Sequence, residues 1–348
     1  GDAERALGIP TEGVRRFPDD AQLRLLAGQL MLLLDRLDEL KALADETVAR
    51  LPDQPEGWEL RGRWLADVQG DYRGAVAAFR EAVGRGPGGD DSLNELALAY
   101  YALNEDREAE RLLDQAIAKD ARGTAARANL AILMLDQNRE AEAEALIAGL
   151  RAQDPGFSTG LLLEGRLAFQ RGDIELATQK FLAASTVDPG QADGVLLTAI
   201  GLQAQEDFAA AADAIDDAMR TDPYDPAAPL VGAVFARDLF DADRSIALAR
   251  EADRRIQATP ALGIDQIDAA RGGAVNVGAA FSFLDLDAWG DLYAERVFDP
   301  LDPGSLFFRA AQSADDSARF SSNTQGFLLD PLGAADRLRY TDVLRRPF

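Results

Sequence analysis

The sequence predicts an all-α protein built from repeated helical hairpins, and three observations support this. Prolines recur about every 34 residues, at Pro18, Pro52, Pro155, Pro189 and Pro223. A helical face of one large residue between two alanines recurs with the same period. The segment before each such face carries a small residue at a matched position. Because self-similarity at a fixed period is typical of repeat architectures, we expect each period to be one structural unit.

The proline period holds across roughly 200 residues. Pro52 and Pro87 are 35 residues apart, and Pro87 and Pro155 are 68 apart, twice the period, with Ala121 where the middle proline would fall. Each proline follows a short polar turn, and proline cannot continue the hydrogen-bond ladder of a helix. The prolines therefore mark the ends of the predicted hairpins.

The second helix of each predicted hairpin carries a face of small, large and small residues. In residues 171–189 this face consists of Ala177, Phe181 and Ala184, whose spacings of four and three place them on one side of a helix. We expect a neighbouring helix to press on the alanines and Phe181 to fill the gap between them. The other units carry Ala75, Phe79, Ala82; Ala109, Leu113, Ala116; Ala143, Ile147; and Ala211, Ile215, Ala218.

The first helix of each predicted hairpin carries one small residue that lets two helix backbones approach closely. These residues are Gly28, Gly62, Ala97, Ala131, Gly165 and Ala199. A Gly-Asp pair marks the turn between the two helices at Gly70-Asp71 and Gly172-Asp173, and the same pair stands at Gly1-Asp2. We therefore expect the sequence to start in mid-repeat, at a second helix.

This pattern resembles the tetratricopeptide repeat, whose 34-residue unit reads W-x2-L-G-x2-Y, then A-x3-F, then P. Trp58 and Gly62 match the first part of that pattern in one unit, and Leu96, Ala97 and Tyr100 match it in the next. The resemblance covers residues 1–257. It implies a right-handed superhelical solenoid of roughly seven hairpins, in which each hairpin buries its apolar face on the next.

The repeat rhythm loosens beyond residue 257. Residues 258–300 predict one degenerate helical pair, which ends on Asp299-Pro300. Residues 301–348 predict a divergent C-terminal cap followed by an extended tail. We therefore expect three regions: the repeat array, the degenerate pair, and the cap with its tail.

Composition excludes several classes of function. The formal net charge is −24, so most of the molecule repels nucleic acid. The chain has no cysteine and no histidine, which removes the usual zinc site and the Ser-His-Asp and Cys-His nucleophiles. No apolar run approaches the roughly 20 residues of a membrane-spanning helix. We expect no catalysis, no cofactor, no metal and no membrane span.

Acidic doublets and one glycine-rich stretch are the other candidate sites. The doublets are Asp19-Asp20, Asp90-Asp91, Asp216-Asp217 and Asp315-Asp316, and they lack the spacing of a calcium loop. We expect most of them at turns and helix starts, where aspartate caps backbone N–H groups. No strand precedes the glycines of residues 84–89, so we expect an inter-repeat loop there and not a phosphate loop.

The family resemblance also implies a binding wall. In tetratricopeptide repeat proteins the first helix of each hairpin faces a concave groove, in which peptides or helices lie. Packing between helices is the alternative role for each residue taken singly. Carried over to this sequence, the groove is lined by Glu59, Arg63, Asn94, Leu98, Tyr101, Asn129, Ile132, Leu162, Arg166, Phe169, Leu196, Ile200 and Gln203.

The last residues are basic although the chain is acidic. Arginines interleaved with apolar residues could dock on an acidic face of this chain or of a neighbouring copy. A solvated linker is the alternative. The candidate docking residues are Arg337, Arg339, Tyr340, Arg345, Arg346 and Phe348.

The sequence therefore predicts a non-enzymatic scaffold for protein–protein interaction. Residues 327–348 loosely resemble the part of bacterial envelope proteins in which a periplasmic repeat array leads into an outer-membrane or export assembly. That resemblance implies a periplasmic or envelope-associated protein. The alternative is a cytoplasmic adaptor or co-chaperone-like protein that binds peptides in its groove. Chaperone-binding relatives clamp a carboxylate with lysine, arginine and asparagine, and here Asn94 and Asn129 are present without the lysines.

Overall fold

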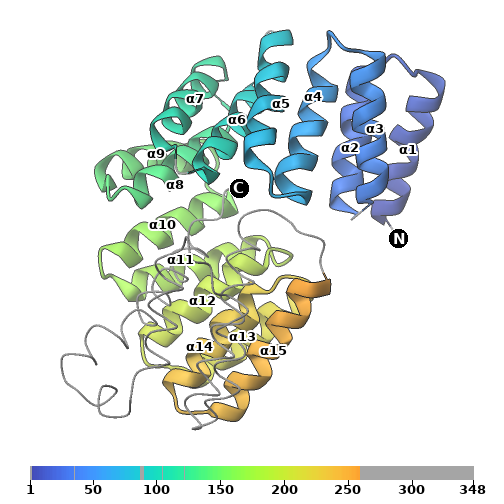
Figure 1. Cartoon of the computed structure of the whole chain (residues 1–348). Coiled ribbons are helices and arrows are strands. Elements are labelled where there is room, and N and C mark those ends of the chain that lie inside the picture. The colour runs from blue at the N-terminus through green and yellow to red at the C-terminus, as the bar shows by residue number, and fades with distance from the viewer. Residues whose placement is uncertain (1, 35, 87–89, 104, 121, 259–348) are drawn as a thin grey trace, which may run out of the picture. The chain divides into compact units, whose positions relative to one another are not determined.

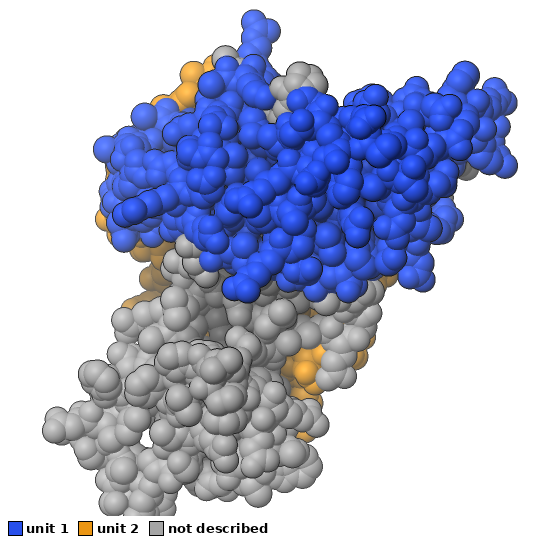
Figure 2. All heavy atoms as spheres, turned by 45° about the horizontal axis from the view of Figure 1, so that its top comes forward, with its two compact units in different colours: residues 1–146, 261–264, 347–348 blue, residues 147–260, 265–346 orange. Residues whose placement is uncertain are grey.

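The computed structural model describes residues 2–34, 36–86, 90–103, 105–120 and 122–258. Every regular element in these ranges is a helix, which confirms the predicted all-α class. The described residues form two compact units, coloured separately in Figure 2. Unit 1 extends to Leu146, and unit 2 starts at Ile147.

The helices follow one another along the chain in pairs (Figure 1). Unit 1 contains α1 (Asp2–Arg16), α2 (Ala21–Leu33), α3 (Leu37–Arg50), α4 (Pro55–Arg63), the π-helix η1 (Trp64–Val68), α5 (Tyr72–Arg85), α6 (Asp90–Ala102), α7 (Asp106–Lys119) and α8 (Ala125–Asp136). Helix α9 (Glu140–Gln153) crosses the unit boundary. Unit 2 continues with α10 (Ser158–Gln170), α11 (Ile174–Val187), α12 (Ala192–Ala204), α13 (Phe208–Thr221), α14 (Ala227–Asp238) and α15 (Ala242–Ala258).

These helices make seven pairs in the described part of the chain, from α2–α3 to α14–α15, and α1 precedes them. The most extensive helix contacts lie within the pairs α4–α5, α6–α7, α10–α11, α12–α13 and α14–α15. Each pair is a first helix followed by a second helix, as the period predicts. The architecture within each unit is therefore a stack of helical hairpins.

One side chain of the second helix sits on a residue of the first helix that has no side chain. Phe181 of α11 is fully buried, between Ala177 and Ala184. A Cβ atom added to Gly165 of α10 would lie 2.5 Å from Cε1 of Phe181 and 3.1 Å from the carbonyl oxygen of Ala177. Gly62 of α4 admits the ring of Phe79 in the same way. Because they lack a Cβ atom, the two glycines leave space for the aromatic ring and allow the two helices to approach closely.

The hairpin turns share one backbone conformation. A residue with positive φ stands in five of them: Gly70 (63°), Asn138 (56°), Gly172 (79°), Glu206 (63°) and Phe240 (61°). In four of these turns the next residue donates its N–H to a carbonyl five positions back, for example Asp173 to Ala168 at 2.9 Å, and Asp71 donates to Leu65, six positions back, after the π-helical turn of η1. This is the Schellman motif, which satisfies carbonyls at the end of the first helix.

The aspartate of the Gly-Asp pair starts the second helix. Asp173 Oδ1 accepts the N–H of Leu176 at 3.1 Å, and Asp71 Oδ1 accepts that of Gly74 at 2.9 Å. Aspartate is among the preferred capping residues because its carboxylate satisfies an unpaired N–H of the first helical turn. In the Gly-Asp pair, the glycine thus adopts the left-handed conformation of the turn and the aspartate caps the second helix.

The acidic doublets divide between caps and ion pairs. Asp20 caps α2 by accepting the N–H of Leu23 at 3.1 Å. The doublet Asp216-Asp217 lies inside α13, so for it the prediction of a turn or helix start is wrong. Asp216 instead pairs with Arg244 of α15 at 3.1 Å, because the two second helices are neighbours in unit 2.

The C-terminal predictions fall outside the described residues. They concern the degenerate pair in residues 258–300 (Ala258 itself ends α15), the cap and tail in residues 301–348, and the docking residues Arg337, Arg339, Tyr340, Arg345, Arg346 and Phe348. These stay predictions. Among the described helices, none is both long enough and apolar enough to cross a membrane.

Replacing Phe181 with alanine should lower the free energy of unfolding by about 3–5 kcal/mol, because it empties the space that Gly165 leaves for the ring. Since each hairpin contacts mainly its neighbours, amide hydrogen exchange should quicken between residues 155 and 223 and little elsewhere. Leu182, which is 55% exposed on the same helix, provides the control: Leu182→Ala should change stability by less than about 0.5 kcal/mol. Uniform loosening along the chain would contradict the hairpin stack.

Replacing Glu206 with glycine should raise the free energy of unfolding by about 1 kcal/mol, because a left-handed conformation is unfavourable for any residue with a Cβ atom. Gly172 has the equivalent conformation, so Gly172→Ala should lower stability by a similar amount. Chemical denaturation of both variants measures the two changes. If both substitutions changed the free energy of unfolding in the same direction, backbone strain would not determine the stability of these turns.

Candidate partner-binding face

The thirteen predicted groove residues all lie on first helices. Seven belong to α4, α6 and α8 of unit 1, and six belong to α10 and α12 of unit 2. Because the placement of one unit relative to the other is not determined, each set is described by itself. The side of unit 1 formed by α2, α4, α6 and α8 is called the first-helix face below.

Side chains one repeat apart meet along the first-helix face. Four hydrogen bonds join successive first helices: Gln22 Nε2 to Glu56 Oε1 at 2.6 Å, Ser92 Oγ to Glu59 Oε2 at 3.1 Å, Asn129 Nδ2 to Asn94 Oδ1 at 3.0 Å, and the Tyr101 hydroxyl to Asp136. The partners are 33 to 35 positions apart in sequence. The repeat period therefore determines which polar groups can pair.

Three acidic residues of this face lie near Arg63. They are Glu59, Asp67 and Glu95, and together they are called the carboxylate cluster. Arg63 Nη2 lies 2.9 Å from Glu95 Oε1 and 3.7 Å from Glu59 Oε1. Glu59 is only 5% exposed. The cluster thus combines an excess of negative charge with burial.

Asp67 has a perturbed acidity. It lies in η1, directly after α4, and burial raises its pKa from 3.8 to about 6, against the opposing effect of the Arg63 guanidinium. Loss of hydration disfavours the charged carboxylate, whereas the nearby cation favours it. The net shift shows that desolvation outweighs the attraction to Arg63.

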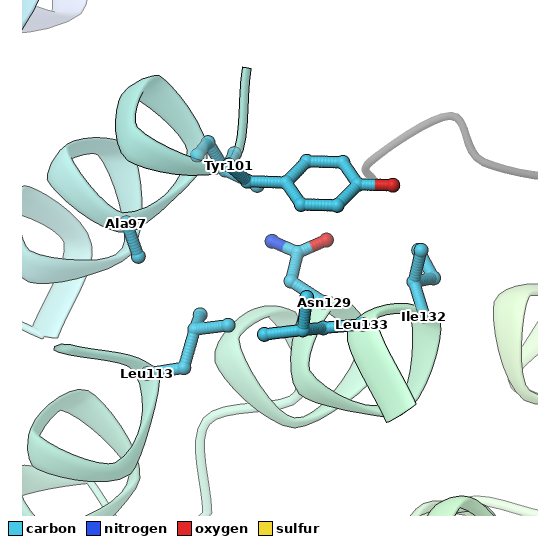
Figure 3. A pocket seen from close by; sticks show the side chains of 7 residues that line it. Ala97, Tyr101, Leu113, Asn129, Ile132 and Leu133 are labelled. Carbon is cyan, nitrogen blue, oxygen red and sulfur yellow. The ribbon is translucent and has the colours of Figure 1, made fainter. Parts of the chain in front are cut away.

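A pocket between α6 and α8 brings together four of the predicted groove residues (Figure 3). Leu98 and Tyr101 come from α6, and Asn129 and Ile132 come from α8. The Tyr101 ring and the Asn129 amide lie at the pocket, with the Ile132 and Leu133 side chains beside them. Its remaining lining residues are Ala97, Leu113 and Leu133. The lining is apolar apart from one amide and one hydroxyl.

The predicted residues of unit 2 are about as buried as those of unit 1, where Glu59, Asn94, Asn129 and Ile132 are at most 7% exposed. Leu162, Leu196 and Ile200 are at most 4% exposed and belong to the hydrophobic core of this unit. Phe169 is partly buried and packs against the same core. Of the polar pair, Arg166 is 3% exposed and Gln203 is partly buried. In this unit the apolar members pack between helices, which is the alternative that the sequence leaves open.

The predicted groove residues do not include several residues that the structure places on this face: Gln22, Glu56, Asp67, Ser92, Glu95 and Asp136. Five of them pair with a residue about one period away, so the period itself contains a signal that could have found them. Asp67 gives no such signal, because its environment depends on the π-helical turn of η1. Within the described ranges, no group of three or more acidic side chains is arranged to hold a metal ion.

Replacing Asp67 with asparagine should stabilise the protein at neutral pH. Because the folded pKa of about 6 exceeds the ordinary aspartate pKa of 3.8, the folded state binds more protons than the unfolded state between these values. The parent's stability therefore falls as pH rises from about 4 to 6. We expect Asp67→Asn to be about 1–2 kcal/mol more stable than the parent above pH 6, since partial exposure weakens the effect, and equally stable below pH 4.

Denaturation curves across this pH range test the Asp67 prediction. Asp53 is exposed, so Asp53→Asn is the matched control and should change stability by less than about 0.5 kcal/mol throughout. An Asp67→Asn variant less stable than the parent at pH 7 would show that the carboxylate is favourably solvated or paired.

Comparison with known proteins supports the repeat architecture. Two family models described as tetratricopeptide repeat match the chain, one over residues 69–123 and 107–167 and the other over residues 40–90 and 162–226. Together they run from residue 40 to residue 226, more than half of the chain. No curated protein matches the sequence.

Solved structures show similarity at low sequence identity. The crystal structure of the APC/C hetero-tetramer Cut9-Hcn1 is 15% identical with a TM-score of 0.58, and the match covers 77% of this chain and 52% of that one. This chain thus spans about half the length of that relative. Pseudomonas aeruginosa pilF is 18% identical with a TM-score of 0.42, covering 65% of this chain and 94% of that one. YrrB, a TPR protein with an unusual peptide-binding site, is 19% identical with a TM-score of 0.40, covering 57% and 97%.

Three independent features now agree. The sequence repeats every 34 residues, the structure places each period in a helical hairpin with Phe181-type packing, and the family models match most of the array. The similarity to Cut9-Hcn1 shows the same kind of fold. The chain belongs to the tetratricopeptide repeat family.

Proposed function

We propose that this chain is a non-enzymatic scaffold that binds a protein or peptide along the first-helix face of unit 1. Tetratricopeptide repeat proteins bind peptide or protein partners, and this chain is a member of that family. The observation that carries the proposal is the pocket between α6 and α8. It stands where the family's binding wall is expected.

Two residues at this pocket, Leu98 and Tyr101, are partly exposed and can contact one apolar side chain of an extended segment. Burial of apolar surface provides the main favourable free energy of most associations. The hydroxyl of Tyr101 adds a polar group beside this apolar surface. Binding sites commonly combine an apolar lining with a few polar groups in this way.

The non-enzymatic part of the proposal depends on the residue types available. The chain contains no histidine and no cysteine, so the commonest general base and the strongest natural nucleophile are both absent from this sequence. The polar groups at the pocket are an amide and a phenol. An amide and a phenol are suited to binding a protein or peptide and not to cleaving a bond in it.

We further propose that the chain is the periplasmic part of a bacterial envelope or export assembly. This is supported by the resemblance of residues 327–348 to envelope proteins and by a cysteine-free sequence, which suits an oxidising compartment. A cytoplasmic adaptor is the alternative. Fractionation of the native cell, with the protein detected by antibody, distinguishes them: recovery with the periplasm or envelope supports the proposal, and recovery with the cytoplasm overturns it.

A display library of random twelve-residue peptides, selected on the full chain, tests the scaffold proposal. Leu98 is partly exposed at the pocket, so Leu98→Arg should fill the pocket with a charged side chain and spare the fold. We expect the enriched peptides to bind this variant at least about tenfold more weakly than the parent, which corresponds to loss of one well-buried apolar anchor.

The matched control is Leu182→Arg, the same change at a 55% exposed position on α11 of unit 2. It should leave the dissociation constants of the selected peptides unchanged. If the library enriches no peptide on the parent, or if both variants bind equally well, the pocket is not the binding site.

A further inference from the structure

We propose that an exposed apolar patch at the hairpin turns of unit 2 docks a cationic amphipathic helix of a partner protein. The patch consists of Phe208, Leu239 and Phe240, at the turns between α12 and α13 and between α14 and α15, and is called the turn patch. This goes beyond the proposed function, because the turn patch belongs to unit 2 and to hairpin turns, not to the first-helix face of unit 1.

The first argument is that large apolar side chains gather where the repeat does not require them. Phe240 is 76% exposed, Leu239 is 42% exposed and Phe208 is 39% exposed. Single exposed apolar residues are normal on a protein surface, whereas a contiguous group marks an interaction site. In the turn between α8 and α9, the positions of Leu239 and Phe208 are held by Gln137 and Glu140, so a hairpin turn of this kind forms without them.

The repeat period places these side chains side by side. Gln205, at the turn between α12 and α13, donates from Nε2 to the Ile174 carbonyl oxygen at 3.3 Å and to Thr178 Oγ1 at 2.8 Å. Leu239 follows Gln205 by 34 positions, and Phe208 follows Ile174 by the same number. Leu239 therefore lies next to Phe208, as Gln205 lies next to Ile174.

The second argument is the backbone conformation of Phe240. Its φ is 61°, in the left-handed region that is unfavourable for a bulky residue. In the other four turns of this conformation within the described ranges, the equivalent residue is glycine, asparagine or glutamate. Because most of the Phe240 side chain is exposed, burial within the chain offsets little of that strain. Strain kept at an exposed aromatic residue points to a role for that residue outside the chain's own fold.

The third argument identifies the occupant by charge. Residues 203–210 and 237–244, which carry the turn patch, contain five acidic residues and two arginines. Both arginines are already engaged, Arg237 with Asp238 and Arg244 with Asp216, each at 3.1 Å. An apolar patch bordered by excess carboxylates matches a ligand that carries lysine or arginine beside apolar side chains.

An amphipathic helix with basic residues presents this pattern. Its apolar residues recur three and four positions apart on one side, and its cations line both borders of that side. The net charge of −24 opposes docking of a second copy, and anionic membranes and nucleic acids are repelled in the same way. A helix from a cationic partner protein is therefore the occupant that this chemistry favours.

Binding of a defined peptide to the full chain tests this docking. The probe is a fluorescently labelled eighteen-residue peptide of leucine and lysine, whose leucines recur three and four positions apart. By fluorescence anisotropy we expect saturable binding, at least about tenfold tighter than that of a peptide of the same composition whose leucines are spread around the helix. Replacing the lysines with glutamate should abolish binding, because acids border the turn patch.

Substitution at Phe240 separates recognition from folding. Phe240→Gly should weaken peptide binding at least about tenfold, because it removes a large apolar contact, and yet raise the melting temperature by about 2 °C, because glycine accepts the left-handed conformation. Leu239→Gln, which installs the residue of the preceding turn, should also weaken binding and keep the melting temperature. The matched control is Asn138→Gly in the turn between α8 and α9, which has the same conformation and should leave binding unchanged. Leu182→Ala removes an exposed leucine elsewhere on unit 2 and should also leave binding unchanged.

Each other result overturns the proposal. Absence of binding, equal binding of the glutamate peptide, or unchanged binding by Phe240→Gly excludes the turn patch as a site for a cationic helix, and a lower melting temperature of that variant assigns the ring to the fold. Sedimentation of the parent as a dimer that Phe240→Gly dissociates assigns the patch to a second copy, and binding to phosphatidylserine vesicles assigns it to a membrane. Leu98→Arg, which tests the proposed function at the pocket, should not change binding of this peptide, so the two proposals fail independently.

Discussion

The hairpins of this protein depend on one contact, the packing of a large second-helix side chain on a small first-helix residue, which is glycine in some units and alanine in others. Where Phe181 meets Gly165, a Cβ atom would lie 2.5 Å from the ring, so no other residue fits without a shift. The contact fixes how far apart the two helices of a hairpin lie. Because the same contact recurs with the period, as at Phe79 and Gly62, successive first helices present the same side to one another.

This common register explains the chemistry of the first-helix face. A residue on one first helix lies beside the residue about 34 positions later, so Asn94 meets Asn129 and Glu59 meets Ser92. Buried polar groups are tolerated when they are hydrogen-bonded, and the repeat supplies those partners in a regular way. The face can therefore hold amides and carboxylates next to an apolar pocket without unfolding the array.

The sequence predicts those parts of the structure that repeat. The hairpins, the place of Phe181 and the helices that carry the groove residues follow from the period, and the structure confirms the fold. Single features were not predictable for physical reasons: Asp67 owes its raised pKa to burial at a π-helical turn, and Glu206 adopts a left-handed conformation that its residue type disfavours. Asp216 pairs with Arg244 across second helices, a contact that no local pattern shows.

Equivalent positions of the two units carry different chemistry. The position held by Glu59 and Asn94 in unit 1 is held by Leu162 and Leu196 in unit 2, where both leucines are buried in the core. A shared backbone therefore does not imply a shared role, because the side chains decide between packing and recognition. Unit 2 uses this position for stability, whereas unit 1 keeps polar groups and a pocket there. Since buried polar groups gain less than apolar ones from packing alone, unit 1 can hold Glu59 and Asn94 at this position because each is hydrogen-bonded to a residue of the neighbouring first helix.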